Sequence, residues 1–291
     1  MNGILLIDKD KDWTSNDVVC KLKGILHERR IGHSGTLDPM ATGLLCVFVG
    51  RATRAVSFSE AHDKRYAAEI TFGIETDTQD STGNVLRRDD RLITRRELEK
   101  VLPAFTGDIL QTPPMYSALK INGERLYKMA RAGISVEREP RPVTVYSIEI
   151  TGNPVPGRFT LDIRCSKGTY IRSLCHDIGA ALGSCAVMSA LRRVEIGPFN
   201  VADAHTIGEI QKLSDSGEDP GRLLLPVSGL FDCCDKLTVN PAAEKKIRNG
   251  NGFDISAPDG KYTVFSNGGE FLALAAVQAE HLTVIKSFYE V

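Results

Sequence analysis

A loop rich in glycine and threonine, Gly32–Gly43, carries the side chain best suited to chemistry, which is Asp38. Glycine and proline together can hold such a loop in one backbone conformation. Pro39 biases Asp38 toward an extended backbone and away from helix. A carboxylate presented in this way could act as a nucleophile or a general base. The alternative is an Asx turn, in which Asp38 only bonds its own backbone.

Other kinds of catalytic or binding loop fit the sequence poorly. A serine-hydrolase elbow requires glycine where Thr36 stands, and no Gly-Lys-Ser/Thr follows to make a phosphate loop. The 6 histidines lack metal-ligand spacing, and residues 76–83 lack the acidic pattern of a calcium loop, so we expect a plain turn there. The 7 cysteines form no C-x-x-C pair and read as reduced thiols of a cytoplasmic protein.

Two further clusters combine cations with aromatic side chains. Lys64, Arg65 and Tyr66 stand at the entry of a predicted strand, where they could contact phosphate and stack on a base. Arg172 falls in the first turn of a predicted helix, next to Tyr170. Because an arginine at a helix N-terminus opposes the helix dipole, we expect a nearby carboxylate to compensate it. Asp38 is the expected partner, and Asp177 or water is the alternative.

A third cluster is the basic, aromatic segment 113–133, which includes Lys120. Its pattern predicts a hairpin followed by a helix, which could lie against a folded RNA backbone. Alternatively, the segment is an amphipathic surface element whose charged face is only solvated. Basic residues are in excess in this part of the chain and in residues 20–72, whereas residues 203–220 are acidic. This uneven charge fits a protein that binds a polyanion on one face.

The elements that must position these side chains follow from capping and periodicity. Thr14 and Thr94 each begin a capping box, and Leu44–Val49 reads as a buried strand. Hairpins and helices interleave without a regular strand–helix–strand rhythm, so the fold class is predicted as α+β with a largely antiparallel sheet. A polar stretch near 203–236 predicts a boundary, followed by a small tail with one helix and three short strands.

The composition restricts the class of protein. The chain has 291 residues, 42% of them hydrophobic and 25% charged, with a formal net charge of −1. These values are typical of a globular protein and exclude an overall basic coat. The apolar runs are too short to span a bilayer, and the N-terminus lacks the pattern of a secretory signal, so we expect no membrane association.

Taken in order, the motifs resemble the TruB family of bacterial tRNA pseudouridine synthases. The family pattern is carried by the loop Gly32–Gly43, by Lys64-Arg65-Tyr66, and by Ser166-Lys-Gly-Thr-Tyr-Ile-Arg172. It continues in Leu191-Arg-Arg193 with Gly197-Pro-Phe199, and the opening Gly3-Ile-Leu-Leu-Ile-Asp-Lys also matches. Ser34, where the family mostly has threonine, is a minor departure. The resemblance covers the catalytic region and is loosest in the tail.

The resemblance implies an enzyme that isomerises uridine 55 in the T-loop of tRNA to pseudouridine. It implies a mixed, mostly antiparallel sheet flanked by helices in a catalytic domain, residues 1–232, with an RNA-binding insertion at about 107–142. A PUA-like RNA-binding domain would occupy residues 233–291. The family needs no metal, nucleotide or redox cofactor. The partner is the T-arm of tRNA, and we expect a monomer.

The same resemblance assigns roles to individual residues. Asp38 would act on C1′ or C6 of the flipped uridine, or as the base of a glycal route, and Arg172 would hold it charged by lowering its pKa. Tyr66 would stack on the base and assist proton removal from C5. Other substrate contacts would come from His33, Tyr170, Leu191, Lys64, Arg65 and Lys120.

Two competing functions remain open at this stage. A tRNA-folding chaperone would bind the T-arm with catalysis secondary. A glycoside hydrolase would need a second carboxylate about 5–10 Å from Asp38, and no acidic residue with a comparable motif stands out in the sequence.

Overall fold

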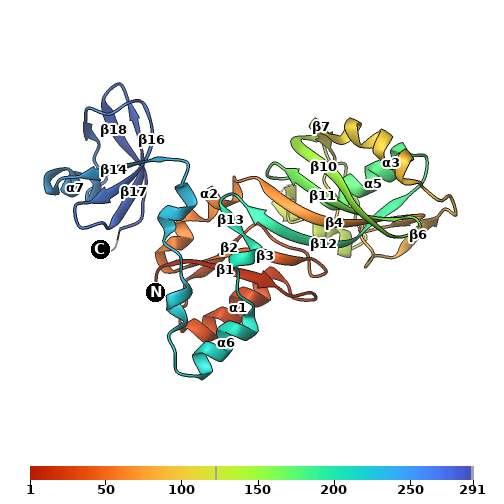
Figure 1. The fold of residues 1–291 in the computed structure, drawn as a ribbon, viewed down its shortest axis with the longest axis horizontal. Coiled ribbons are helices and arrows are strands. Elements are labelled where there is room, and N and C mark those ends of the chain that lie inside the picture. The colour runs from red at the N-terminus through yellow and green to blue at the C-terminus, as the bar shows by residue number, and fades with distance from the viewer. Residues whose placement is uncertain (122, 290–291) are drawn as a thin grey trace.

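The computed structural model describes residues 1–121 and 123–289 (Figure 1). Its main sheet has nine strands, seven of them in the order β1-β3-β12-β4-β11-β10-β7. Only β3 and β12 run parallel, so the predicted α+β class with a mostly antiparallel sheet is confirmed. The strands are β1 (Gly3–Lys9), β2 (Ile31–Ser34), β3 (Thr42–Val49), β4 (Lys64–Phe72), β7 (Gly107–Gln111), β10 (Arg141–Val155), β11 (Arg158–Cys165), β12 (Ala186–Ile196) and β13 (Phe199–Asn200).

The helices begin where the capping signals predict. Thr14 forms a capping box with Asp17 at α1, and Thr94 forms another with Glu97 at α3. Helix α5 begins at Ile171 with Tyr170 as its N-cap residue, so Arg172 lies in the first turn as predicted. The helices are α1 (Ser15–Leu26), α2 (Val56–Glu60), α3 (Arg95–Val101), α4 (Leu126–Arg131), α5 (Ile171–Ala181), α6 (Ile207–Asp215) and α7 (Pro241–Arg248).

Strand β3 is buried on both faces, which explains its unbroken apolar sequence. Leu44, Cys46 and Phe48 pack in one core cluster, whereas Leu45 and Val47 pack against α1 and α6 in another. Strand β4, in contrast, alternates between buried and more exposed residues. Its buried side faces α5, so the side chains on that side share a core with the start of α5.

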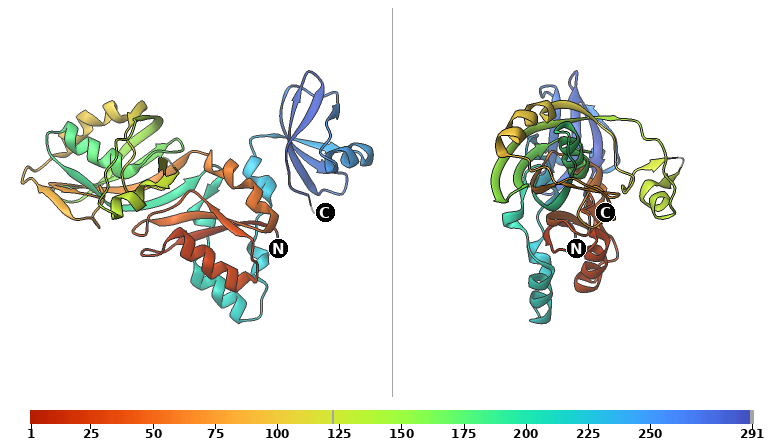
Figure 2. Two further views of the ribbon diagram at one scale, coloured as in Figure 1. Left: turned by 180° about the vertical axis from the view of Figure 1, so that it is seen from behind. Right: turned by 90° about the vertical axis from the view of Figure 1, so that its right-hand side faces the viewer.

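The segment between β7 and β10 leaves the body of the molecule. It contains the short hairpin β8 (Lys120–Ile121) and β9 (Glu124–Arg125), followed by α4. The right-hand view of Figure 2 shows these elements projecting to one side of the main sheet. The predicted hairpin and helix are therefore confirmed, and the segment forms an arm that we call the 112–135 arm. A second small hairpin, β5 (Ile74–Thr76) with β6 (Val85–Arg88), brackets the turn at 77–84.

The C-terminal part forms a separate five-stranded sheet at one end of the molecule (Figure 1). An aromatic cluster that joins Phe58 and Phe231 to Phe271 and Phe288 packs it against the rest of the chain. The predicted helix and three strands are present, and two more strands complete the sheet. The strands are β14 (Asp235–Val239), β15 (Phe253–Asp254), β16 (Gly260–Ser266), β17 (Phe271–Gln278) and β18 (His281–Ser287).

Candidate active site

The side chains of Asp38 and Arg172 meet although 134 positions separate them in the chain. Asp38 lies on the turn between β2 and β3, and Arg172 lies in the first turn of α5. Arg172 Nε is 3.0 Å from Asp38 Oδ2. Asp177, the alternative partner, pairs with His176 instead. The ion pair expected from the charge at the helix N-terminus is therefore present, and it compensates a guanidinium that is only 7% exposed.

Arg172 also binds groups that the sequence did not point to. It donates to the carbonyl oxygens of Thr78 at 3.1 Å and Tyr116 at 2.7 Å, and Nη1 lies 3.7 Å from Asp80 Oδ2. Asp80 lies in the segment 76–83 that the sequence predicts as a plain turn. It is buried, and its Oδ1 accepts hydrogen bonds from Thr78 and Thr82. The turn thus supplies a second carboxylate to the site. The spacing of the residues in the turn did not predict that role.

Two buried residues near the N-terminus brace the loop that carries Asp38. Ser15 Oγ donates to the Leu37 carbonyl and accepts from the Leu37 amide at 2.9 Å. Lys9, which is fully buried, donates to the carbonyls of Trp13 and Pro39. Burial lowers the pKa of Lys9 to about 8, although nearby aspartates oppose that shift. These contacts fix the loop backbone on both sides of Asp38.

The electrostatics of Asp38 differ from the expectation. Arg172 lowers the pKa of Asp38, as the sequence predicts, but the net pKa is raised above its ordinary value. Burial is the largest cause, Arg172 opposes it, and the charge of Asp80 adds to it. Loss of hydration disfavours the carboxylate more than the guanidinium favours it. A carboxylate with a raised pKa is a stronger base than an ordinary aspartate.

Tyr66 and Leu191 belong to the same hydrophobic core as the loop that carries Asp38. Both belong to the cluster that contains Leu37 and Met40, the neighbours of Asp38 on its loop. Tyr66 is only 8% exposed, so most of its ring is covered in the absence of RNA.

His33 lies on β2, and burial followed by the charge of Arg193 lowers its pKa, which favours the neutral imidazole. Its Nδ1 is buried and has no hydrogen-bond partner among the described residues.

Tyr170 is positioned by a residue that the sequence analysis did not single out. Gln111, at the end of β7, is buried and accepts from the Tyr170 amide at 2.7 Å. It also donates to the Tyr170 carbonyl at 3.0 Å. This pair of hydrogen bonds fixes the residue before α5 and hence the direction in which Arg172 leaves the helix.

The three cations assigned to substrate contacts lie elsewhere. Lys64 is buried and donates to the carbonyls of Glu60 and His62. Arg65 alternates to the other side of β4, where it pairs with Asp162 and Glu195. Lys120 is exposed on the 112–135 arm. The structure thus joins Asp38 to Arg172 and places Tyr66 near enough for the charge of Asp38 to act on it, whereas the three cations contact other groups or lie on the arm.

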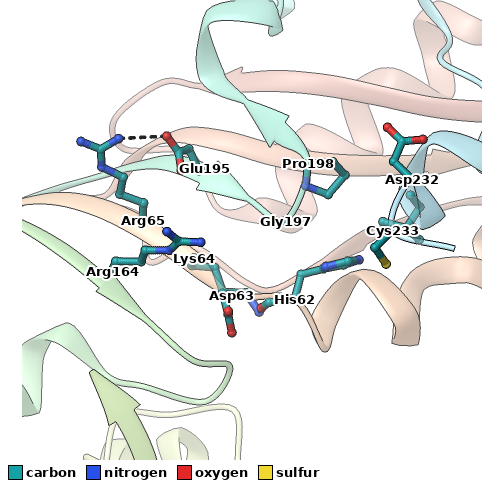
Figure 3. Close-up of a pocket in the computed structure, with 11 residues that line it drawn as sticks. His62, Asp63, Lys64, Arg65, Arg164, Glu195, Gly197, Pro198, Asp232 and Cys233 are labelled. Atoms are coloured by element: carbon teal, nitrogen blue, oxygen red, sulfur yellow. Dashed lines mark hydrogen bonds and ion pairs between the residues drawn. The ribbon is translucent and has the colours of Figure 1, made fainter. Parts of the chain in front are cut away.

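Lys64 and Arg65 line a cavity of about 260 Å³ that does not include Asp38 (Figure 3). Arg164, His62, Asp63 and Cys233 also line it, and the Arg65–Glu195 ion pair closes one side.

Within residues 1–121 and 123–289, no cluster of three or more His, Cys, Asp or Glu side chains is arranged to hold a metal ion. None of the helices in the same ranges is long and apolar enough to cross a membrane.

The sequence matches the N-terminal domain of TruB family pseudouridylate synthases over residues 23–171. Residues 172–231 match the C-terminal domain of tRNA pseudouridylate synthase B. The chain belongs to the TruB family. It is 39% identical over 292 residues to tRNA pseudouridine synthase B of Shouchella clausii, covering 98% of this chain and 96% of that protein. The corresponding protein of Alkaliphilus oremlandii is 43% identical over 251 residues, covering 86% and 82%.

The fold of this TruB family member is also found in solved structures. A chain in a crystal structure of a Cbf5–Nop10–Gar1 complex aligns with a TM-score of 0.75 and 25% identity, covering 99% of this chain and 85% of that chain. A chain of an H/ACA ribonucleoprotein bound to a substrate RNA containing 2′-deoxyuridine aligns with a TM-score of 0.74 and 23% identity, covering 99% and 85%. The second likeness concerns the fold alone.

Proposed function

We propose that Asp38 is the catalytic carboxylate with which this enzyme converts uridine 55 of the tRNA T-loop to pseudouridine. Family membership gives the reaction: the chain is a tRNA pseudouridine synthase. The observation that supports the residue assignment is the ion pair between Asp38 and Arg172, which orients a carboxylate on a loop braced at both ends. Asp38 is 36% exposed as a side chain, so a flipped nucleoside can reach it.

The proposed chemistry uses Asp38 as a nucleophile or base at the ribose or at uracil C6. The N-glycosidic bond breaks, the uracil turns, and C5 rejoins C1′, so that the product is an isomer of the substrate. Arg172 keeps the carboxylate oriented, and Asp80 holds Arg172 from its other side. Extruding a loop uridine takes a few kcal/mol at most. Contacts between the protein and the RNA backbone would offset that amount.

We further propose how the rest of the chain serves this reaction. Residues 1–232 form the catalytic domain, with the insertion at about 107–142 lying against the T-arm, and residues 233–291 act as a PUA-like RNA-binding domain. Exposed Lys120 is a candidate phosphate contact. His33, Tyr170 and Leu191 would surround the base. The active form would be a monomer in the cytoplasm, and light scattering tests its oligomeric state.

The substitution Asp38→Asn tests the assignment. It removes the charge but keeps the size, so the variant should bind a T-arm RNA within about twofold of the unmodified protein. Turnover, followed by tritium release from uracil labelled at C5, should be lost. Binding without turnover separates catalysis from a chaperone role. A normal rate of pseudouridine formation by the folded variant would show that another group does the chemistry.

A further inference from the structure

Arg193 is the largest fully buried side chain among the described residues. It is 1% exposed, and its Nε and Nη2 donate to the carbonyls of Leu44 at 2.8 Å and Gly35 at 2.9 Å. Among the described residues, no Asp or Glu oxygen lies within 4.0 Å of its guanidinium. Burying a charge without a counter-ion is expensive. A purely structural role would be served more cheaply by an uncharged side chain.

The strand register points Arg193 at one group in particular. In the antiparallel pair of β12 with β4, Arg193 lies directly opposite Tyr66. Side chains that face each other across such a pair lie on the same side of the sheet with their Cβ atoms about 5 Å apart. The positive charge of Arg193 acts on Tyr66 and lowers its pKa against the effect of burial. A bulge follows immediately, between Arg193 and Glu195, and ends this register.

Two glycines, Gly35 and Gly43, lie close to Arg193. Gly35 and Gly43 both have positive φ, of 66° and 95°. A Cβ on Gly35 would lie 3.3 Å from Arg193 Nη1, and one on Gly43 would lie 2.3 Å from the Arg193 carbonyl oxygen. Two glycines of the loop that carries Asp38 therefore make room for this arginine. The guanidinium links that loop to the strand that carries Tyr66.

A guanidinium has five N–H donors and no acceptor. Arg193 can therefore act on the Tyr66 hydroxyl oxygen only as a donor or through its positive charge, and both favour negative charge on that oxygen. The negative charge of Asp38 raises the pKa of Tyr66. Burial raises the pKa of Tyr66, and the charge of Arg193 works against that effect. A fixed positive charge that costs no reorganisation during the reaction stabilises negative charge that develops beside it.

We propose that Arg193 is a positioning residue for Tyr66, whose oxygen it orients and polarises for removal of the C5 proton. This inference rests on the proposed function. After C5 has bonded to C1′, the C5–H bond breaks and its electron pair forms the C5–C6 double bond. The C6–N1 π electrons take a proton from water at N1. The C5 proton passes to the Tyr66 oxygen as the phenol gives its own proton to solvent water, and Arg193 stabilises the negative charge that develops on that oxygen.

Single-turnover kinetics on a T-arm RNA carrying uridine deuterated at C5 test this role, with loss of deuterium read by mass spectrometry. Arg193→Gln should slow the reaction by about 10²-fold and enlarge the isotope effect, because C5–H cleavage then limits the rate. In the Tyr66→Phe background the same change should have an effect of less than about twofold. Arg192→Gln is the control on the same strand as Arg193. It breaks a half-buried pair with Asp8 of β1 and should leave the isotope effect unchanged.

The proposal is overturned if Arg193→Gln slows the Tyr66→Phe protein as much as it slows the unmodified one. Arg193 would then act only by holding the loop. If Arg193→Gln fails to fold, the same isotope effect is measured on Arg193→Lys, which keeps the positive charge but loses the planar guanidinium. An enlarged isotope effect supports the inference, because a lysine no longer orients the Tyr66 oxygen, and one like that of the unmodified protein contradicts it. Absence of pseudouridine with the unmodified protein would instead refute the proposed function, so the two failures are distinguishable.

Discussion

Arg172→Lys separates the role of positive charge from that of the planar guanidinium. The arginine fork reaches Asp38, the carbonyls of Thr78 and Tyr116, and Asp80 from one fixed plane. A lysine ends in a single ammonium that acts as a point charge. It cannot reach groups on so many sides at once. The variant should keep a cation near Asp38 but lose its orientation and the link to the 112–135 arm through Tyr116.

The size of the effect follows from the burial of the contacts. Arg172 is only 7% exposed, so solvent screens its hydrogen bonds weakly. A hydrogen bond to a charged group contributes about 1.5–3 kcal/mol. Loss of two of them at the lower figure amounts to about 3 kcal/mol, which corresponds to a rate reduction of about 10²-fold if the loss falls on the transition state.

The assay is single-turnover pseudouridine formation, with tRNA affinity and melting temperature measured in parallel. Arg95→Lys is the matched control, because Arg95 makes an exposed ion pair with Glu99 within α3. Such pairs contribute about 0.3–0.5 kcal/mol, so this variant should keep the normal rate. A rate for Arg172→Lys within a factor of two of the unmodified protein would refute the reasoning, since charge alone would then suffice.

The remaining predictions concern stability and pH. Lys9 has a pKa of about 8 in the folded protein against 10.5 unfolded, so the unfolded chain binds more protons between these values. Stability should therefore rise with pH across that window, and urea titrations should show a smaller rise for Lys9→Met. Gly43→Ala should destabilise by more than about 2 kcal/mol, because its φ is 95° and the new Cβ meets Arg193 backbone. Gly24→Ala, in open space on α1, should stabilise by about 0.5–1 kcal/mol in the same titration. The raised pKa of Asp38 places the acid limit of kcat/KM above pH 3.8, and a limit at or below that value would contradict the burial argument.

Local patterns in the sequence were sufficient for most of the secondary structure. The capping boxes at Thr14 and Thr94 bond only residues within the first turn of their own helices, so they can be recognised without the fold. The apolar run of β3 and the alternation of β4 likewise predict how deeply each strand is buried. Asp38 stood out because Pro39 restricts its backbone in any context, and the surrounding glycines permit turns that other residues disfavour.

The site itself needed the tertiary structure. Asp80 reaches Arg172 because a turn lies beside β12, where Asp80 bridges to Met188. Arg193 faces Tyr66 because of the register between two strands far apart in the chain. A shift of one residue in that register would send Arg193 to the other face of the sheet. Register, burial and the balance between desolvation and charge depend on long-range pairing. Sequence therefore determined which residues could do chemistry, and packing decided which of them meet.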